Sequence, residues 1–243
     1  MKKIFSLLIL SLFVLTGNVV AQQGVLRTQG HPREDLTVGE NAFKPFSISA
    51  PNYDTDFTME DIVFWVGDEN CENRAALVID WYEEGKGITL VWGYRWNGDA
   101  YGIDMLKAIA AADSRLYLLL YQGTQYGTAI GGIGYDLGTS HEKCLINGDT
   151  QYCAGNDGII DTRSYNFDSY RAVDPNDNWQ SGWYNGYWSY HTKDSYAQNF
   201  EYSQLGASSR KLVNNSWDGW GYQIGWESWV GMLPRIPYAP APR

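Results

Sequence analysis

Aromatic residues crowd beside glycines in this chain, and this crowding constrains what it can fold into. The sequence holds 11 Trp and 18 Tyr, concentrated in residues 90–98 (LVWGYRWNG) and 179–190 (WQSGWYNGYWSY), with a third cluster over 217–229. Glycine beside an aromatic ring lets the ring lie flat and lets another surface approach the backbone. The pattern therefore predicts a surface that binds a planar or sugar-like molecule.

The first 21 residues have the pattern of a secretory signal peptide. A short basic start precedes an apolar stretch over 4–15, which is too short to span a bilayer, and small residues end at Ala21. The next cysteine is Cys71, so a lipid anchor would lack an acceptor thiol. We therefore expect an exported protein, periplasmic or extracellular, that is not lipid-anchored.

The charge of the chain narrows its partners. Its formal net charge is −10 over 243 residues. An acidic surface repels polyanions, which argues against nucleic acid or an anionic membrane as the partner.

Three cysteines define the expected covalent links. Cys144 and Cys153 are separated by a turn-forming Asn-Gly-Asp, so we predict a local disulfide between them, with Cys71 left over. Pairing of Cys71 with either of the other two is the alternative. No CxxC pair exists, so we predict no metal site on these thiols.

Strands dominate the expected secondary structure. Runs rich in β-branched and aromatic residues, bounded by turn residues, predict strands at residues 62–67, 75–82, 88–96, 116–122, 186–193, 199–203, 210–213 and 219–226, with an edge strand at 43–48. Residues 123–182 read as loop-rich because of their repeated glycine turns.

One helix is expected, at about residues 102–113, where apolar residues recur at helical spacing. Its stripe should pack on the sheet. The predicted fold class is α+β: one β-dominated domain at 61–232 with an antiparallel or mixed sheet, after a weakly structured segment at 22–60. A Pro-rich tail at 233–243 should cover or trail the domain, since proline cannot pair in a central strand.

Alternation along the strands selects the candidate ligand-binding residues. Trp92, Tyr94 and Trp96 share one face of their strand, whereas Arg95 faces the other, free to stack on a ring or to pair with Asp80 or Asp104. The first face is either core beneath the helix or an open stacking platform. Rings after residue 182 fall on both faces of a strand, which favours a groove on one of them. The predicted ligand-binding set is Trp92, Tyr94, Trp96, Trp183, Tyr187, Trp188 and Trp217.

Catalysis and metal binding are not expected. Ser189, His191 and Asp194 are crowded on one short segment rather than arranged as a triad, and no G-x-S-x-G elbow occurs. We expect His191 to be a surface or hydrogen-bonded side chain. The loop aspartates do not match a calcium-binding loop, so we predict neither catalytic nor metal-ligating residues and no cofactor.

Two motifs resemble a family of poorly characterised exported and cell-surface bacterial proteins of the Bacteroidetes type. Residues 92–113 resemble its GYRWDG…DML.AI…D pattern, and residues 186–220 resemble its GYWSYW…GASSR…SWDGW segment. Asn97 replaces an expected Asp, and His191 an expected Trp. The resemblance implies a place beside outer-membrane uptake systems for corrinoids or similar cofactors, and the element order is similar to the C-terminal domain of transcobalamin-type proteins.

The leading hypothesis is a non-catalytic, exported binding protein whose aromatic groove captures a corrinoid-like ligand for uptake, with an outer-membrane uptake partner. A carbohydrate-binding module is the first alternative, since sugar faces also stack on Trp. A structural or adhesive surface component, in which every ring is core, is the second.

Overall fold

The structure is a computed structural model that describes residues 57–82, 88–138, 142–196, 198–225, 234 and 239–242. The predicted signal peptide and the strand expected at 43–48 lie outside these residues. Among the described residues, no helix has the length and apolarity needed to cross a bilayer.

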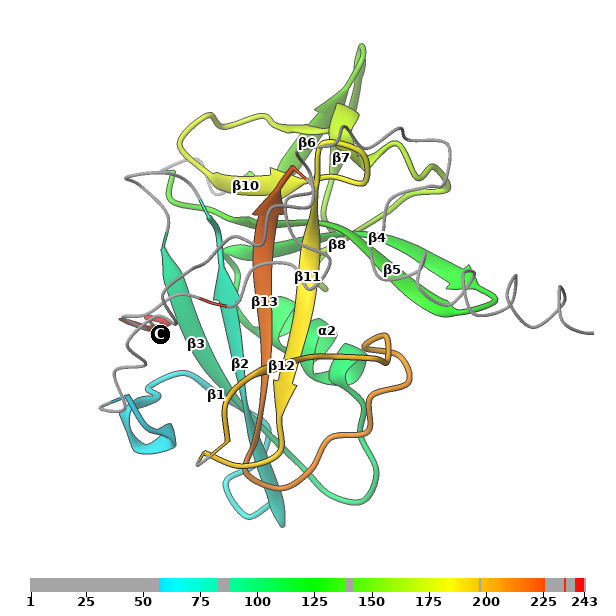
Figure 1. Ribbon diagram of the computed structural model, residues 1–243. Helices are drawn as coiled ribbons and strands as arrows, with labels where there is room; N and C mark the ends of the chain where they lie inside the picture. The colour runs from blue at the N-terminus through cyan, green and yellow to red at the C-terminus, as the bar shows by residue number, and fades with distance from the viewer. Residues whose placement is uncertain are drawn as a thin grey trace, which may run out of the picture.

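Four long strands form the centre of the larger sheet (Figure 1). β2 (Asn73–Asp80) pairs antiparallel with β3 (Thr89–Trp96) and parallel with β13 (Ser216–Ile224), which pairs antiparallel with β11 (Gly186–Lys193). The central strands match those predicted from the β-branched and aromatic runs. The sheet is mixed, as expected, because β2 and β13 are far apart in sequence yet run in the same direction.

Short strands close the edges of this sheet. β12 (Glu201–Tyr202) flanks β11, while β1 (Trp65–Val66) and β14 (Ala239–Pro240) both pair with the outer edge of β3. Proline is tolerated at an edge because its missing N–H would face away from the ladder. Part of the Pro-rich tail thus covers a sheet edge.

The strand predicted at 116–122 belongs to a second sheet, and the segment predicted to be loop-rich supplies the other strands of that sheet. β4 (Leu116–Thr124) pairs with β5 (Gly127–Tyr135), and β10 (Asn178–Ser181) and β8 (Ile159–Asp161) flank them. A small third sheet holds β6 (Cys144–Asn147), β7 (Thr150–Cys153) and β9 (Arg171–Ala172). The prediction was wrong for β5 because its glycines were read as turns.

The helix α2 (Gly102–Ala112) lies between the two larger sheets (Figure 1). Its predicted stripe of Ile103, Leu106, Ile109 and Ala110 is buried in one core with side chains of β2, β3, β4, β11 and β13. The first turn is tied down when Tyr101 N–H donates to Asp104 Oδ2 at 2.8 Å. The predicted α+β class, with one helix on mixed sheets, is confirmed.

The segment predicted as a strand at 210–213 begins instead in a loop, over 207–210, that caps this helix. Gly102 N–H donates to Arg210 O at 2.9 Å, and Ile103 N–H donates to Ala207 O at 3.0 Å. The only ladder contact of this segment among the described residues is an isolated bridge between Tyr101 and Lys211. Unpaired N–H groups at a helix start need acceptors, and this loop supplies them.

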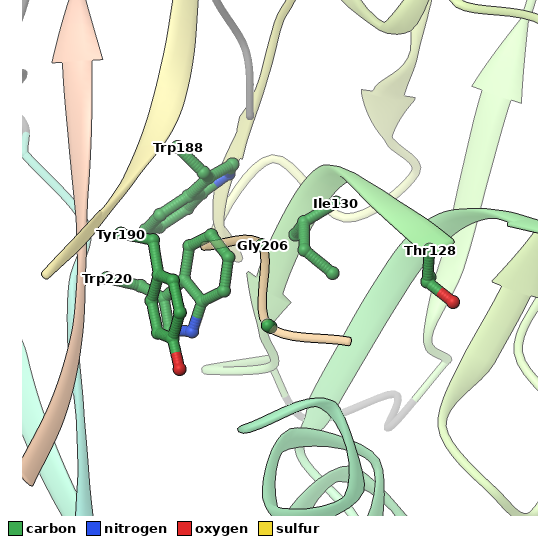
Figure 2. Close-up of a pocket in the computed structure, with 7 residues that line it drawn as sticks. Thr128, Ile130, Trp188, Tyr190, Gly206 and Trp220 are labelled. Atoms are coloured by element: carbon green, nitrogen blue, oxygen red, sulfur yellow. The ribbon is translucent and has the colours of Figure 1, made fainter. Parts of the chain in front are cut away.

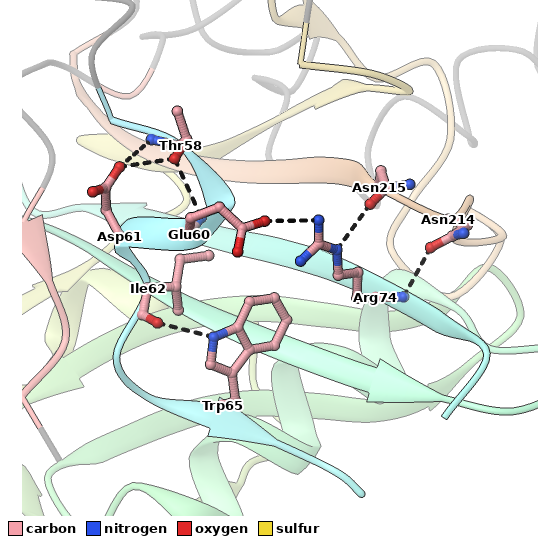
Figure 3. A network of polar contacts seen from close by, with 8 residues as sticks. All are labelled: Thr58, Glu60, Asp61, Ile62, Trp65, Arg74, Asn214 and Asn215. Atoms are coloured by element: carbon pink, nitrogen blue, oxygen red, sulfur yellow. Dashed lines mark hydrogen bonds and ion pairs between the residues drawn. The ribbon is translucent and has the colours of Figure 1, made fainter. Parts of the chain in front are cut away.

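A polar network fixes the first described turn, η1 (Met59–Asp61), to β2 (Figure 3). Arg74 Nη2 donates to Glu60 Oε1 at 2.9 Å, and its Nε donates to Asn215 Oδ1 at 3.0 Å. Trp65 Nε1 donates to Ile62 O at 2.9 Å, which orients the indole over β3. Arg95 stacks on that indole, 4.5 Å from its centroid, which is one of its two predicted roles.

Candidate functional site

The seven rings predicted to bind a ligand lie mostly in the protein interior. Tyr94 is half-buried, stacked on Trp96 with centroids 5.6 Å apart. The other six are no more than 6% exposed: Trp92, Trp96, Trp183, Tyr187, Trp188 and Trp217. Their faces are covered by protein, so of the two alternatives these six rings are core in the structure.

Two of the buried indole N–H groups have hydrogen-bond partners inside the protein. Trp92 Nε1 donates to Asp113 Oδ2 at 3.0 Å, and Trp188 Nε1 donates to Gln180 O at 2.9 Å. A buried N–H needs such an acceptor, because leaving it unpaired costs about 1–3 kcal/mol. These hydrogen bonds fix the two indoles as structural side chains.

The two ends of the second resemblance motif, residues 186–190 and 216–220, lie on neighbouring strands. Tyr190 of β11 lies opposite Trp220 of β13, with ring centroids 4.4 Å apart and planes 19° apart. Trp188 lies opposite Tyr222 at 5.4 Å. The motifs GYWSY and SWDGW therefore form one cross-strand aromatic ladder, whose inner rings join the main core.

A small cavity lies beside this ladder. Figure 2 shows Trp188, Tyr190 and Trp220 on one side of it, with Ile130 and Thr128 on the other. Its volume is about 20 Å³. One water molecule needs about 10–15 Å³, whereas pockets for drug-sized ligands run from about 300 Å³ upward. The cavity fits water, not a corrin or a sugar.

A buried charged network adjoins the ladder at the start of α2. The Tyr190 hydroxyl donates to Asp218 Oδ2, and Arg210 bridges Asp218 at 3.6 Å and Asp194 at 2.6 Å. Burial raises the pKa of Asp218 to about 6, against the lowering effects of Tyr190 and Arg210. Each side chain of this network contacts another member of it. The network is therefore a structural cluster rather than an open reactive site.

Glycines explain how so many rings pack inside. A Cβ built on Gly134 would lie 2.1 Å from Tyr117 Cζ, and one on Gly93 would lie 2.2 Å from Trp65. Both pairs are cross-strand neighbours. The same approach recurs at other glycines of the sheets: Gly131 under Phe167, Gly132 under Trp179, and Gly186 beside Tyr222. Rings covering glycines in adjacent strands stabilise a sheet by protecting bare backbone.

Partly exposed rings gather instead at the end of β4. Tyr121 and Tyr165 are half-buried, with centroids 4.6 Å apart. On its inner side Tyr165 packs against two buried rings, with centroid distances of 5.4 Å to Trp183 and 5.8 Å to Phe167. We name Tyr121 and Tyr165 the tyrosine ledge.

Polar side chains with both donors and acceptors border the tyrosine ledge. The Arg163 guanidinium lies 6.0 Å from the Tyr121 centroid and pairs with Asp161 at 3.2 Å. Their side chains are 71% and 37% exposed, respectively. Lys107 Nζ donates to Gln122 Oε1 at 2.6 Å on the same strand end.

A carboxylate holds the loop that supports the ledge. Asp168, in the turn η2 (Phe167–Ser169), accepts backbone N–H groups from Trp183 and Tyr184 at 2.9 Å and from Asn185 at 2.8 Å. Charge-assisted hydrogen bonds of this kind are about twice as strong as neutral ones. The WYNG loop thus has a fixed position, and with it the ring of Trp183.

Sequence reasoning missed the tyrosine ledge because nothing local marks it. Tyr121 ends a strand read as buried, and Tyr165 lies in a segment read as loop. The Asp-Thr-Arg run at 161–163 is a weak signal, since exposed charged residues are common in loops.

The predicted disulfide between Cys144 and Cys153 is present, joining facing positions of β6 and β7, and Cys71 is a free, half-buried thiol. No group of His, Cys, Asp or Glu within the described ranges is arranged to hold a metal ion.

His191 is buried rather than on the surface. Its ring lies edge-on to that of Tyr202, with centroids 5.6 Å apart. Ser189 donates to Gly221 O at 2.8 Å, and Asp194 pairs with Arg210 at 2.6 Å.

No protein-family model, curated protein or solved structure matches this chain, so the resemblance seen in the two motifs stays a prediction.

Proposed function

We propose that this protein binds glycans without catalysis, through the tyrosine ledge. The observation that carries the proposal is Tyr165, a half-exposed ring with Trp183 and Phe167 behind it and Tyr121 beside it. A ring held from behind loses little conformational entropy when a ligand stacks on it.

The side chains around the tyrosine ledge favour a sugar over a planar ligand. Sugars combine apolar C–H faces with hydroxyl groups that both donate and accept hydrogen bonds. Tyrosine rings suit the faces, while Arg163 donates and Asp161 accepts toward the hydroxyls. The net charge of −10 disfavours nucleic acids as ligands, because the protein would repel their backbone phosphates.

A corrinoid ligand has less support from the geometry. The rings predicted to stack on it are mostly buried, and the cavity beside Trp188 and Trp220 is of water size. A purely structural or adhesive role agrees with the buried rings but leaves the border of the ledge unexplained.

A glycan array with the full chain identifies the ligand, and isothermal titration with the strongest hit measures its affinity. We expect dissociation constants of about 10 μM to 1 mM, typical of a small, exposed contact. Tyr165→Ala and Arg163→Ala should each weaken binding by about 10-fold, which is ~1.4 kcal/mol.

The matched control is Tyr196→Ala, which removes an exposed ring from a different part of the surface. Its affinity should equal that of the unaltered chain. Equal binding by Tyr165→Ala would overturn the proposal, as would the absence of any glycan hit. Quenching of tryptophan fluorescence by about 10 μM cyanocobalamin, retained in Tyr165→Ala, would favour the corrinoid hypothesis instead.

A further inference from the structure

Lys193 lies among three aromatic rings at the end of β11. Its Nζ is 4.8 Å from the centroid of Trp217, 5.1 Å from Phe200 and 5.2 Å from Tyr196. Trp217 is its direct neighbour across the ladder to β13. We name Trp217, Phe200 and Tyr196 the ring box. It belongs to a ring cluster separate from the tyrosine ledge.

No carboxylate pairs with Lys193 among the residues that the structure describes. The adjacent Asp194 is engaged by Arg210 Nη2 at 2.6 Å. Lys211 differs in this respect, because its Nζ lies 2.7 Å from Asp99. Burial lowers the pKa of Lys193 to about 8, and the pKa of Lys211 is raised by Asp99.

We propose that Lys193 is an amine nucleophile that captures aldehydes as an imine within the ring box. The neutral amine attacks the carbonyl carbon, the carbonyl oxygen leaves as water, and the resulting imine takes up one proton. No electrons are exchanged, so the step needs no oxidant or reductant. Desolvated lysines without an ion-pair partner are the ones that form Schiff bases.

The ring box also suits the product. A protonated imine is a cation with fewer N–H groups to hydrate than an ammonium ion, so ring faces replace its water at a lower cost. Lys193 is half-buried and Tyr196 is 41% exposed, so the ring box lies at the protein surface, where a small carbonyl compound can approach.

Benzaldehyde with cyanoborohydride tests this on the full chain. Hydride reduction converts each imine to a stable benzyl-lysine, and peptide mass mapping gives a rate for each site at pH 7.5. Lys193 should be labelled at least ~10-fold faster than Lys211, because a larger fraction of its amine is neutral. It should also exceed Lys143, whose pKa is lowered by burial but which has no recorded ring contact in the described structure.

Tyr196→Ser tests whether the ring box keeps water away from Lys193. Tyr196 is 41% exposed, so its loss should leave the fold intact while admitting water to Lys193. Labelling of Lys193 should then fall ~10-fold toward the rate of Lys211. Tyr101→Ser, at an exposed ring outside the box, should change nothing. The proposal is overturned if Lys143 is labelled as fast as Lys193, or if Tyr196→Ser retains the original rate in a folded protein.

Discussion

The ring of Tyr117 lies over Gly134, the residue directly opposite it in the neighbouring strand. Trp179 belongs to β10, which pairs with the opposite edge of β5, and its ring stacks on that of Tyr117 with planes 1° apart. The space that a side chain on Gly134 would need is filled by the ring, since its Cβ would lie 2.1 Å from Tyr117 Cζ.

Gly134→Ala should therefore destabilise the protein by about 1–3 kcal/mol, the usual cost of overpacking a well-filled core. Urea unfolding followed by circular dichroism measures this. Gly155→Ala, in an exposed loop where the new Cβ meets only the carboxylate of Asp157, should stay within about 0.5 kcal/mol. Equal stabilities of the two variants would contradict the proposed packing.

The backbone hydrogen bonds that Asp168 accepts predict a second effect on stability. Asp168→Ala removes the acceptor of three backbone N–H groups in the WYNG loop, which should cost about 2–3 kcal/mol. The expected loss is smaller in Asp168→Asn, because the amide oxygen still accepts. Hydrogen exchange at residues 183–185 should accelerate in the Ala variant. Unchanged exchange there would show that the carboxylate does not hold the loop.

Buried acids predict an uncommon dependence of stability on pH. Burial is the main cause that raises the pKa of both Asp218 and Asp177 to about 6. Because these folded-state pKa values exceed the unfolded ones near 4, the folded protein binds more protons between pH 4 and 6. The stability that they contribute is therefore present at about pH 4 and is lost as pH rises through 6.

Asp218→Asn should flatten this dependence, because the amide does not titrate. The expected change in the drop between about pH 4 and pH 7 is on the order of 1–3 kcal/mol in the free energy of unfolding. Urea unfolding at a series of pH values measures it. Asp99→Asn, at an exposed carboxylate, should keep the original slope. An unchanged slope in Asp218→Asn would mean that Asp218 does not titrate in this window.

The disulfide gives a simpler prediction. Cys144 and Cys153 are nine positions apart, so their loop is short, and removing the link with Cys144→Ser/Cys153→Ser should cost about 2–3 kcal/mol. A thiol titration of the unfolded, unreduced chain should detect one free thiol, from Cys71. Three free thiols would contradict the presence of the disulfide, and a free thiol that peptide mapping places at Cys144 or Cys153 would contradict its pairing.

Apolar residues at helical spacing were sufficient to predict α2. Runs of β-branched and aromatic residues bounded by turns were sufficient to predict the long strands β2, β3, β4, β11 and β13. β5 could not be predicted, since Gly131, Gly132 and Gly134 look like turn residues unless the rings above them are known. Those rings come from other segments, so the information lies in tertiary contacts.

The candidate site escaped prediction for the same reason. Gly beside Trp was interpreted as a platform for a ligand, whereas the glycines accommodate rings of adjacent strands, as Gly93 does for Trp65. A sequence shows which residues are aromatic but not what covers their faces. Tyr165 and Trp183 pack against each other, but Tyr165 is half-buried whereas Trp183 is only 5% exposed.

Hydroxyl-radical footprinting with residue-resolved mass spectrometry tests the central claim most directly, because oxidation of each ring reports its contact with water. We expect fast oxidation of Tyr121, Tyr165 and Tyr196 and strong protection of Trp92, Trp188 and Trp217. Adding a bound glycan should protect Tyr121 and Tyr165 alone. Rapid oxidation of the three tryptophans in the folded protein, with the two ledge tyrosines protected before any ligand is added, would contradict the account.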